Sequence, residues 1–426
     1  MYCIIEEKMK KINKINKINK INAFMCCIIL ITFIFVGFIG EIRVSADSEK
    51  QTVRVVTQKE LNKALKNPKV ETIILRTSTY DKIIISSKKA KTKNIIIDAP
   101  NSNIINKAKF NSIELINAQK YTENVSGNTI TTHTTSFIVA ENKKVNKLIL
   151  STIGHDYIIR KGASIKQFSI NINGKTSKYD KNKKAYTISV RHVDWEGYDD
   201  LLLDYTIKVD DAGRINNIEY TDGYGFYGIA EISYDDNGNV TTLYIYDDFY
   251  GGAEQFSEYE YDDYYNPIIE YIDENNSYGE NTYEYDSKNR LISKKSKTNY
   301  GYNIGMFLTS STYEYDSKNR LVKIVENSEN GKYKTKTETK NTYNKKGYLT
   351  RQIVKETGSI SSKSIYTNEY DKNGDKIYST IDNYYSNGYN EIIEYMYYYD
   401  KYGSMQEGYV KQPGDKVWRD ISKVGD

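Results

Sequence analysis

Apolar and polar residues alternate in short runs along most of the chain, and this pattern predicts strands. Between residues 71 and 172, isoleucine-rich runs such as Glu71–Leu75, Asn94–Asp98 and Gln167–Ile172 are separated by turns of Lys, Asn and Ser. The runs begin from about ten to over twenty residues apart, and no helical period lies between them. This spacing argues against β-α-β units and favours a coil of short strands.

One helix is predicted just before these strands. Thr57 stands three residues before Glu60, which is the spacing of a capping box, and Leu61 and Leu65 share one face. Residues 52–175 therefore resemble the capped start of right-handed parallel β-helix proteins such as the pectate-lyase-like group. The lyases of that group need clustered acids for calcium. Asp98 and Glu114 are isolated in a lysine-rich region, so the resemblance implies the fold and not the activity.

From residue 200 onward a tyrosine-aspartate turn recurs, most clearly in Tyr283–Leu291 and Tyr313–Leu321, which are nearly identical. Asp or Asn opens a type I turn, and three positions later the chain must adopt a positive φ, which Gly and then Asn tolerate best. Only the third turn breaks this rule, with Tyr265 at that position. The turn residues are Asp210, Gly213, Asp235, Gly238, Asp262, Asp286, Asn289, Asp316, Asn319, Asn344, Gly347, Asp371, Gly374, Asp400 and Gly403.

The eight turns lie 24 to 30 residues apart, which suits one hairpin plus a return strand for each unit. Before each turn the sequence alternates, as in Tyr283-Glu284-Tyr285, so tyrosines share one face of the sheet and form ladders between neighbouring strands. These tyrosines either replace Val and Leu as packing residues or form a platform for sugars. The array resembles the RHS or YD repeats of bacterial wall-associated and toxin-delivery proteins. Because it is short and few residues follow it, a toxin cage is not expected.

The first 46 residues combine lysines, an apolar run from Ala23 to Gly40 and the small residues of Val44-Ser45-Ala46. This pattern predicts a secretory signal cleaved after Ala46, and a retained membrane anchor is the alternative. All three cysteines (Cys3, Cys26 and Cys27) lie in this leader, so the mature chain has no disulfides. An exported chain without cysteine and rich in Lys, Ile, Asn and Tyr suits a Gram-positive bacterium.

Charge divides the chain into blocks that help to place domains. Residues 47–190 hold 26 basic and 11 acidic residues, whereas residues 191–286 hold 3 basic and 25 acidic residues. We expect a signal peptide (1–46), a β-solenoid (47–190), a YD-type repeat array (195–410) and a tail (411–426). The basic block predicts binding to anionic wall polymer, or else it serves solubility or complements the acidic block. That block is a solvated face, a diffuse calcium site or a docking surface.

No catalytic constellation is evident. His133, His155 and His192 are scattered, and the sequence contains no nucleophile elbow or Walker loop. The segments 235–239 and 371–375 resemble calcium loops, but the turn explains each of their residues. We therefore expect no enzyme activity, cofactor, metal site or nucleic-acid partner, and no membrane contact after cleavage.

The sequence predicts an all-β protein: a right-handed parallel β-solenoid with a capping helix, followed by stacked antiparallel hairpins. Its expected role is non-catalytic binding or structure at the cell envelope or in the medium, with a glycan or an anionic wall polymer as partner. Two alternatives are a polysaccharide lyase or hydrolase with a degenerate site, and a remnant of an RHS toxin-delivery protein.

Overall fold

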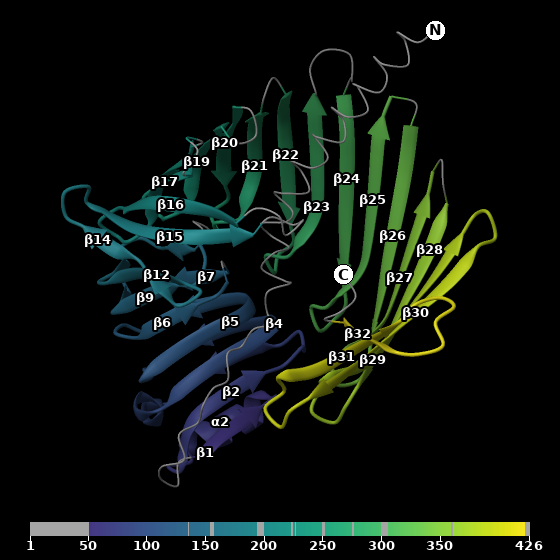
Figure 1. Cartoon of the computed structure of the whole chain (residues 1–426), viewed down its shortest axis with the longest axis horizontal. Coiled ribbons are helices and arrows are strands. Elements are labelled where there is room, and N and C mark those ends of the chain that lie inside the picture. The colour runs from purple at the N-terminus through teal and green to yellow at the C-terminus, as the bar shows by residue number, and fades with distance from the viewer. Residues whose placement is uncertain are drawn as a thin grey trace. The chain divides into compact units, whose positions relative to one another are not determined.

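The structure is a computed structural model that describes residues 51–134, 136–153, 157–193, 200–222, 225, 227–248, 252–274, 277–299, 306–331, 333–358 and 361–421. The described residues belong to one compact unit, residues 50–426. The expected leader and its cysteines lie outside the described residues, as does His155. The described part is all-β, with one α-helix and one short 3₁₀ helix (Figure 1).

Residues 51–172 form a parallel β-solenoid, which confirms the predicted fold class. Its long strands β4 and β5 each bend and contribute to two ladders, which run β1-β2-β4-β5-β6-β9-β12 and β3-β4-β5-β7-β10. The strands are β1 (Gln51–Val55), β2 (Val70–Arg76), β3 (Lys82–Ile85), β4 (Asn94–Asn106), β5 (Ser112–Glu123), β6 (Thr129–Thr132), β7 (Phe137–Val139), β8 (Lys144–Val145), β9 (Lys147–Leu150), β10 (Ile158–Ile159), β11 (Ser164–Ile165) and β12 (Phe168–Ile172).

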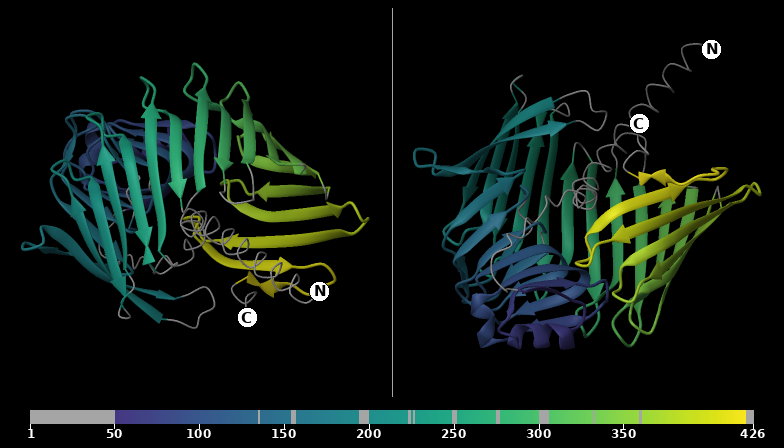
Figure 2. Two further views of the ribbon diagram at one scale, coloured as in Figure 1. Left: turned by 90° about the horizontal axis from the view of Figure 1, so that it is seen from above. Right: turned by 60° about the horizontal axis from the view of Figure 1, so that its bottom comes forward.

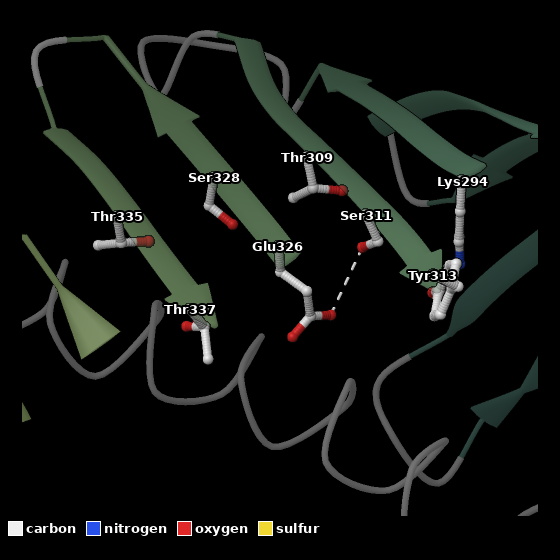
Figure 3. Close-up of a pocket in the computed structure, with 8 residues that line it drawn as sticks. All are labelled: Lys294, Thr309, Ser311, Tyr313, Glu326, Ser328, Thr335 and Thr337. Carbon is white, nitrogen blue, oxygen red and sulfur yellow. Dashed lines mark hydrogen bonds between the residues drawn. The ribbon is translucent and has the colours of Figure 1, made fainter. Parts of the chain in front are cut away.

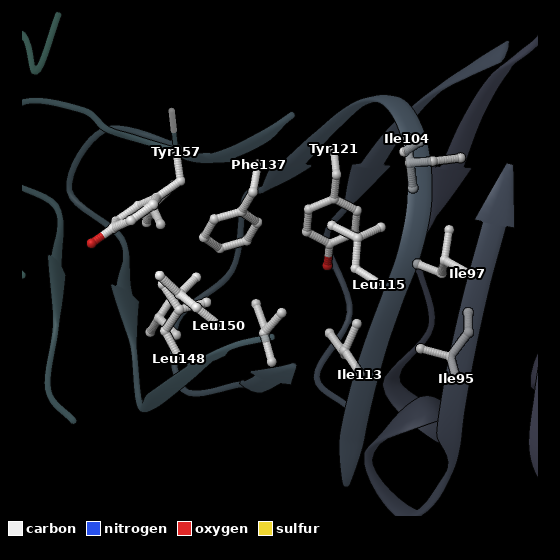
Figure 4. Close-up of a cluster of buried hydrophobic side chains, with 14 of the residues drawn as sticks. Ile95, Ile97, Ile104, Ile113, Leu115, Tyr121, Phe137, Leu148, Leu150 and Tyr157 are labelled. Carbon is white, nitrogen blue, oxygen red and sulfur yellow. The ribbon is translucent and has the colours of Figure 1, made fainter. Parts of the chain in front are cut away.

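Apolar side chains stack from rung to rung inside the solenoid (Figure 4). One ladder joins residues that are all buried: Ile73, Ile95, Ile113, Ile130, Leu148 and Phe168. A second brings the rings of Tyr121 and Phe137 to a centroid distance of 5.8 Å. The period of two along each strand sends these residues inward, and β-branched isoleucine packs well in such ladders.

The single α-helix, α2 (Gln58–Lys66), begins with the expected capping box. The Glu60 N–H donates to the Thr57 hydroxyl, and the Glu60 carboxylate accepts from the Thr57 N–H. Leu61, Ala64 and Leu65 are buried in the same cluster as the strands. The helix thus covers apolar residues at the first rung, as its amphipathic pattern predicts.

The rest of the described chain forms one antiparallel sheet of 19 strands, in which each strand pairs with its neighbours in sequence (Figures 1 and 2). A short strand β13 (Lys175–Thr176) pairs with β12 before the sheet begins. The sheet strands are β14 (Lys178–Asp180), β15 (Ala185–Val193), β16 (Asp200–Val209), β17 (Ile215–Asp222), β18 (Tyr227–Tyr234), β19 (Val240–Asp247), β20 (Ala253–Tyr261), β21 (Pro267–Glu274), β22 (Ser277–Tyr285), β23 (Leu291–Asn299), β24 (Met306–Tyr315), β25 (Leu321–Asn330), β26 (Tyr333–Tyr343), β27 (Leu349–Thr357), β28 (Ser362–Tyr370), β29 (Lys376–Tyr385), β30 (Asn390–Tyr399), β31 (Met405–Lys411) and β32 (Arg419–Asp420).

The sheet begins earlier than the charge pattern suggests. Strands β14 and β15 belong to it, so the expected boundary at residue 190 falls inside β15. One face of the first sheet strands then joins the solenoid core: Ile188, Ile207, Ile218, Ile232 and Leu243 belong to the same buried cluster as the solenoid residues. Solenoid and sheet therefore share apolar packing at this end of the array.

Candidate binding surfaces

All eight tyrosine-aspartate turns have one geometry, and we call them together the turn row. In the fourth turn, one carboxylate oxygen of Asp286 accepts from the N–H groups of Lys288 and Arg290, at 2.9 and 3.1 Å. The Asn289 N–H donates to the Asp286 carbonyl, and each hairpin has a register shift beside the turn. This is a type I turn with a bulge, the geometry expected from the sequence.

The position three residues after the turn Asp or Asn is left-handed in every turn. The φ angle is 84° at Gly238, 88° at Gly374, 59° at Asn289 and 63° at Asn319, in agreement with the expectation. Tyr265 in the third turn is also left-handed, at 65°. Its hydroxyl donates to Glu141 at 3.0 Å, so contacts with the solenoid hold this tyrosine in a conformation that tyrosine rarely adopts.

In four of the eight turns, the tyrosine that precedes the turn residue joins consecutive units. The hydroxyls of Tyr315 and Tyr343 donate to the carbonyls of Leu291 and Leu321, in the unit before, at 2.9 and 2.8 Å. Tyr234 and Tyr370 make the equivalent bonds. Because these hydroxyls are satisfied by backbone, the geometry favours packing over a sugar platform for these rings.

The residue four positions after the turn Asp makes hydrogen bonds in several turns. Arg290 and Arg320 each donate a hydrogen bond to the Asp carboxylate of their own turn. Their guanidinium groups also lie over the tyrosine ring of the next unit, 4.6 and 4.7 Å from the ring centroid. In three of the turns that contact the solenoid, this position holds a smaller acceptor. The carboxylate of Asp375, the amide of Asn239 and the hydroxyl of Ser404 stand there.

These three acceptors bind the three arginines of the solenoid. Arg54 makes two bonds of 2.6 Å to the Asp375 carboxylate, and both side chains are only 8% exposed. Arg160 bonds Asn239, and Arg76 reaches the Ser404 hydroxyl at 3.4 Å. The first turns thus contact the last solenoid rungs, and the last turns contact the first rungs. The sequence offered no local signal for this match.

The solenoid's lysines lie elsewhere, mostly at one corner of successive rungs. This lysine corner consists of the connecting loops after β3, β4, β5, β7 and β10, namely residues 86–93, 107–111, 124–128, 140–146 and 160–167. The last two loops include the two-residue strands β8 and β11. Backbone and amide bonds link each loop to the next, for example Asn111 N–H to Lys93 O and Lys166 N–H to Val145 O, both at 2.9 Å. The loops hold ten lysines: Lys88, Lys89, Lys91, Lys93, Lys107, Lys109, Lys143, Lys144, Lys161 and Lys166.

Most charge at this corner is unpaired. Eight of these lysines are exposed, Lys143 is half-buried, and Lys93 is buried with its ammonium on backbone carbonyls. Within the described residues, none of the ten forms an ion pair. The corner has one acidic residue, Glu141, and its carboxylate accepts a hydrogen bond from the Tyr265 hydroxyl. The corner therefore presents a row of free ammonium groups.

A second surface lies on the sheet itself. A pocket of about 300 Å³ is lined by side chains from β23 to β26: Lys294, Thr309, Ser311, Tyr313, Glu326, Ser328, Thr335 and Thr337 (Figure 3). The strand register places Ser311 opposite Glu326, and Glu326 opposite Thr337. We call this group the polar pocket; it displays five Ser and Thr hydroxyls beside one acid and one base.

Within the described residues, no group of three or more His, Cys, Asp or Glu side chains is placed to hold a metal ion. His133 lies 3.4 Å from Glu114, with both side chains well exposed. The Arg76 Nε–H donates a hydrogen bond to the Asp98 carboxylate at 2.9 Å. Burial raises the pKa of the Asp98 carboxyl. No helix among the described residues is both long and apolar enough to cross a membrane.

One buried acid stands out within the solenoid. The Glu123 carboxylate is fully buried and accepts from Tyr121 at 2.7 Å and from the amides of Asn106 and Asn128 at 3.0 Å. Burial raises the pKa of Glu123 to about 7, against the opposing effect of these hydrogen bonds. Since every partner is itself buried, the network is structural and not open to a ligand.

Comparisons with known proteins identify no family. No family model matches the chain, and no curated protein matches it. A solved structure of a porin-like protein from Bacteroides uniformis aligns with 46% of this chain and 87% of its own, at 13% identity and a TM-score of 0.26. A similarity at that level supports no statement about fold or function.

Proposed function

We propose that this is an exported, non-catalytic protein of the bacterial cell envelope or medium, which binds an anionic polymer at the lysine corner. The observation behind the proposal is the row of exposed lysines without ion-pair partners on consecutive rungs. Teichoic acid and acidic polysaccharides are polymers of this class.

The geometry suits a linear polyanion. Neighbouring rungs of a parallel coil lie about 4.8 Å apart, so a chain lying along the corner meets lysines from four of its five loops. Lysine ammonium groups act as mobile point charges and hold phosphate or carboxylate without demanding one orientation. Binding is therefore weakly selective and sensitive to salt.

The acidic block does not neutralise these lysines within the molecule. The contacts between solenoid and turn row use Arg54, Arg76 and Arg160, and none of the ten corner lysines forms an ion pair among the described residues. Free lysines thus remain available to an external partner. In this proposal the array, with its resemblance to YD repeats, is the rigid support of the solenoid.

The test measures retention of residues 47–426 on immobilised wall teichoic acid between 50 and 500 mM NaCl, over which the Debye length shrinks from about 14 to 4 Å. We expect retention at low salt that is lost at high salt. The variant Lys107→Glu, Lys109→Glu, Lys144→Glu should abolish it.

The matched control changes three exposed array lysines, Lys318→Glu, Lys336→Glu and Lys355→Glu, which alters net charge equally. It should retain binding. No retention of the unchanged protein at 50 mM NaCl, or equal loss in both variants, would refute the proposal.

A further inference from the structure

The acid of the polar pocket differs from another glutamate of the same sheet. On β21 and β22, one oxygen of the Glu270 carboxylate accepts from the Tyr283 hydroxyl at 2.7 Å and from the Asn281 amide at 2.8 Å. The hydrogen bonds to this carboxylate therefore come from the neighbouring strand of the sheet.

Glu326 in the pocket has no such partners. Among the described residues, its one hydrogen bond comes from the Ser311 hydroxyl, at 3.5 Å, the limit of a hydrogen bond. Within the described residues, the Tyr313 hydroxyl makes no hydrogen bond at all. The pocket therefore combines a free tyrosine hydroxyl with a carboxylate that has most of its accepting capacity left.

We propose that the polar pocket binds an uncharged oligosaccharide. Glu326 accepts hydrogen bonds from sugar hydroxyls, and Lys294 donates to them. Thr309, Ser328 and Thr335, which lie in one cross-strand row, donate or accept. The ring of Tyr313 supplies an apolar surface for the face of a sugar.

The charge of the pocket favours a neutral ligand over a polyanion. One acid and one base line it, so its net charge is zero, whereas the lysine corner is strongly basic. Its volume of about 300 Å³ lies at the small end of ligand sites, which suits a few sugar units. The inference does not depend on polymer binding at the corner.

The experiment titrates residues 47–426 with maltopentaose, cellopentaose and chitopentaose by isothermal calorimetry, at 50 and 500 mM NaCl. We expect at least one pentasaccharide to bind with an affinity that salt changes less than twofold. Salt independence separates this site from the lysine corner, because binding there fades as salt rises.

Two variants locate the site. Glu326→Ala and, separately, Tyr313→Phe should weaken binding about tenfold and about threefold, since a hydrogen bond to a charged group contributes more than one to a neutral group. The Tyr313→Phe change removes only one hydroxyl, so it still tests the site if Glu326→Ala reduces stability.

The control uses the opposite face of the same strands. Ser310 and Asn327 alternate with the pocket residues and face one another across the strands, so Ser310→Ala with Asn327→Ala should leave affinity unchanged. The proposal fails if none of the three sugars binds at millimolar concentration. It also fails if pocket and control variants weaken binding equally.

Discussion

The ion pair between Arg54 and Asp375 joins the first strand to the seventh turn, 321 residues later, and its loss should be costly. Both side chains are 8% exposed, and the guanidinium forms two bonds of 2.6 Å to the two carboxylate oxygens. Replacing Arg54 by Met keeps the apolar stem but leaves the Asp375 charge buried without its partner. Removing one member of a buried pair costs about 3 to 5 kcal/mol.

We therefore expect Arg54→Met to lower the free energy of unfolding by about 3 kcal/mol, measured by urea denaturation with circular dichroism at pH 7 and fixed salt. The double variant Arg54→Met, Asp375→Leu should recover most of this loss, because neither charge then remains buried. The exposed pair of Lys323 and Glu314, 2.7 Å apart, is the control. Lys323→Met should cost much less than Arg54→Met, because surface ion pairs contribute little to stability.

The reasoning would be refuted by a loss below about 1 kcal/mol for Arg54→Met. A double variant whose loss equals the sum of the two single losses would refute it as well, since independent sites add and coupled sites do not.

The other predictions concern single residues. Gly374→Val should cost about 2 kcal/mol in urea denaturation, because φ is 88° and the new Cβ would meet the Tyr348 ring; no measurable loss would contradict the turn geometry. Burial raises the pKa of Glu123 to about 7 from an ordinary 4.5, so the folded state binds a proton that the unfolded state releases. Stability should therefore fall by about 3 kcal/mol as pH rises from 4.5 to 7, and less so in Glu123→Gln; identical pH profiles would count against it. Exported protein should begin at Asp47, and Edman sequencing that finds an intact leader in the membrane fraction would overturn cleavage.

Features set by local chemistry could be predicted from the sequence. The capping box of Thr57 and Glu60 depends on residues three apart, and each Tyr-Asp turn depends on five consecutive residues. Their geometry follows from backbone sterics and hydrogen bonding within that stretch. The all-β fold follows from the period of two in the runs between them.

Features that depend on distant contacts could not be predicted in this way. Tyr265 looked like a defect in the third turn, yet its ring lies 4.2 Å from the Arg160 guanidinium, on a segment more than a hundred residues earlier. In the same way Asp375 looked like one more turn residue until Arg54 was placed beside it. Nothing in the spacing of either residue records its partner.

The contrast between arginine and lysine in the solenoid is the one sequence signal that would have pointed to this contact. Arg54, Arg76 and Arg160 are the only arginines among residues 51–176, where lysines are abundant. Arginine presents a planar fork that matches a carboxylate or two nearby oxygens, and it is less strongly hydrated than lysine. The three arginines meet the turn row, whereas eight of the ten lysines of the corner stay exposed. Arginine thus joins the solenoid to the array, whereas the lysines of the corner form no ion pair among the described residues.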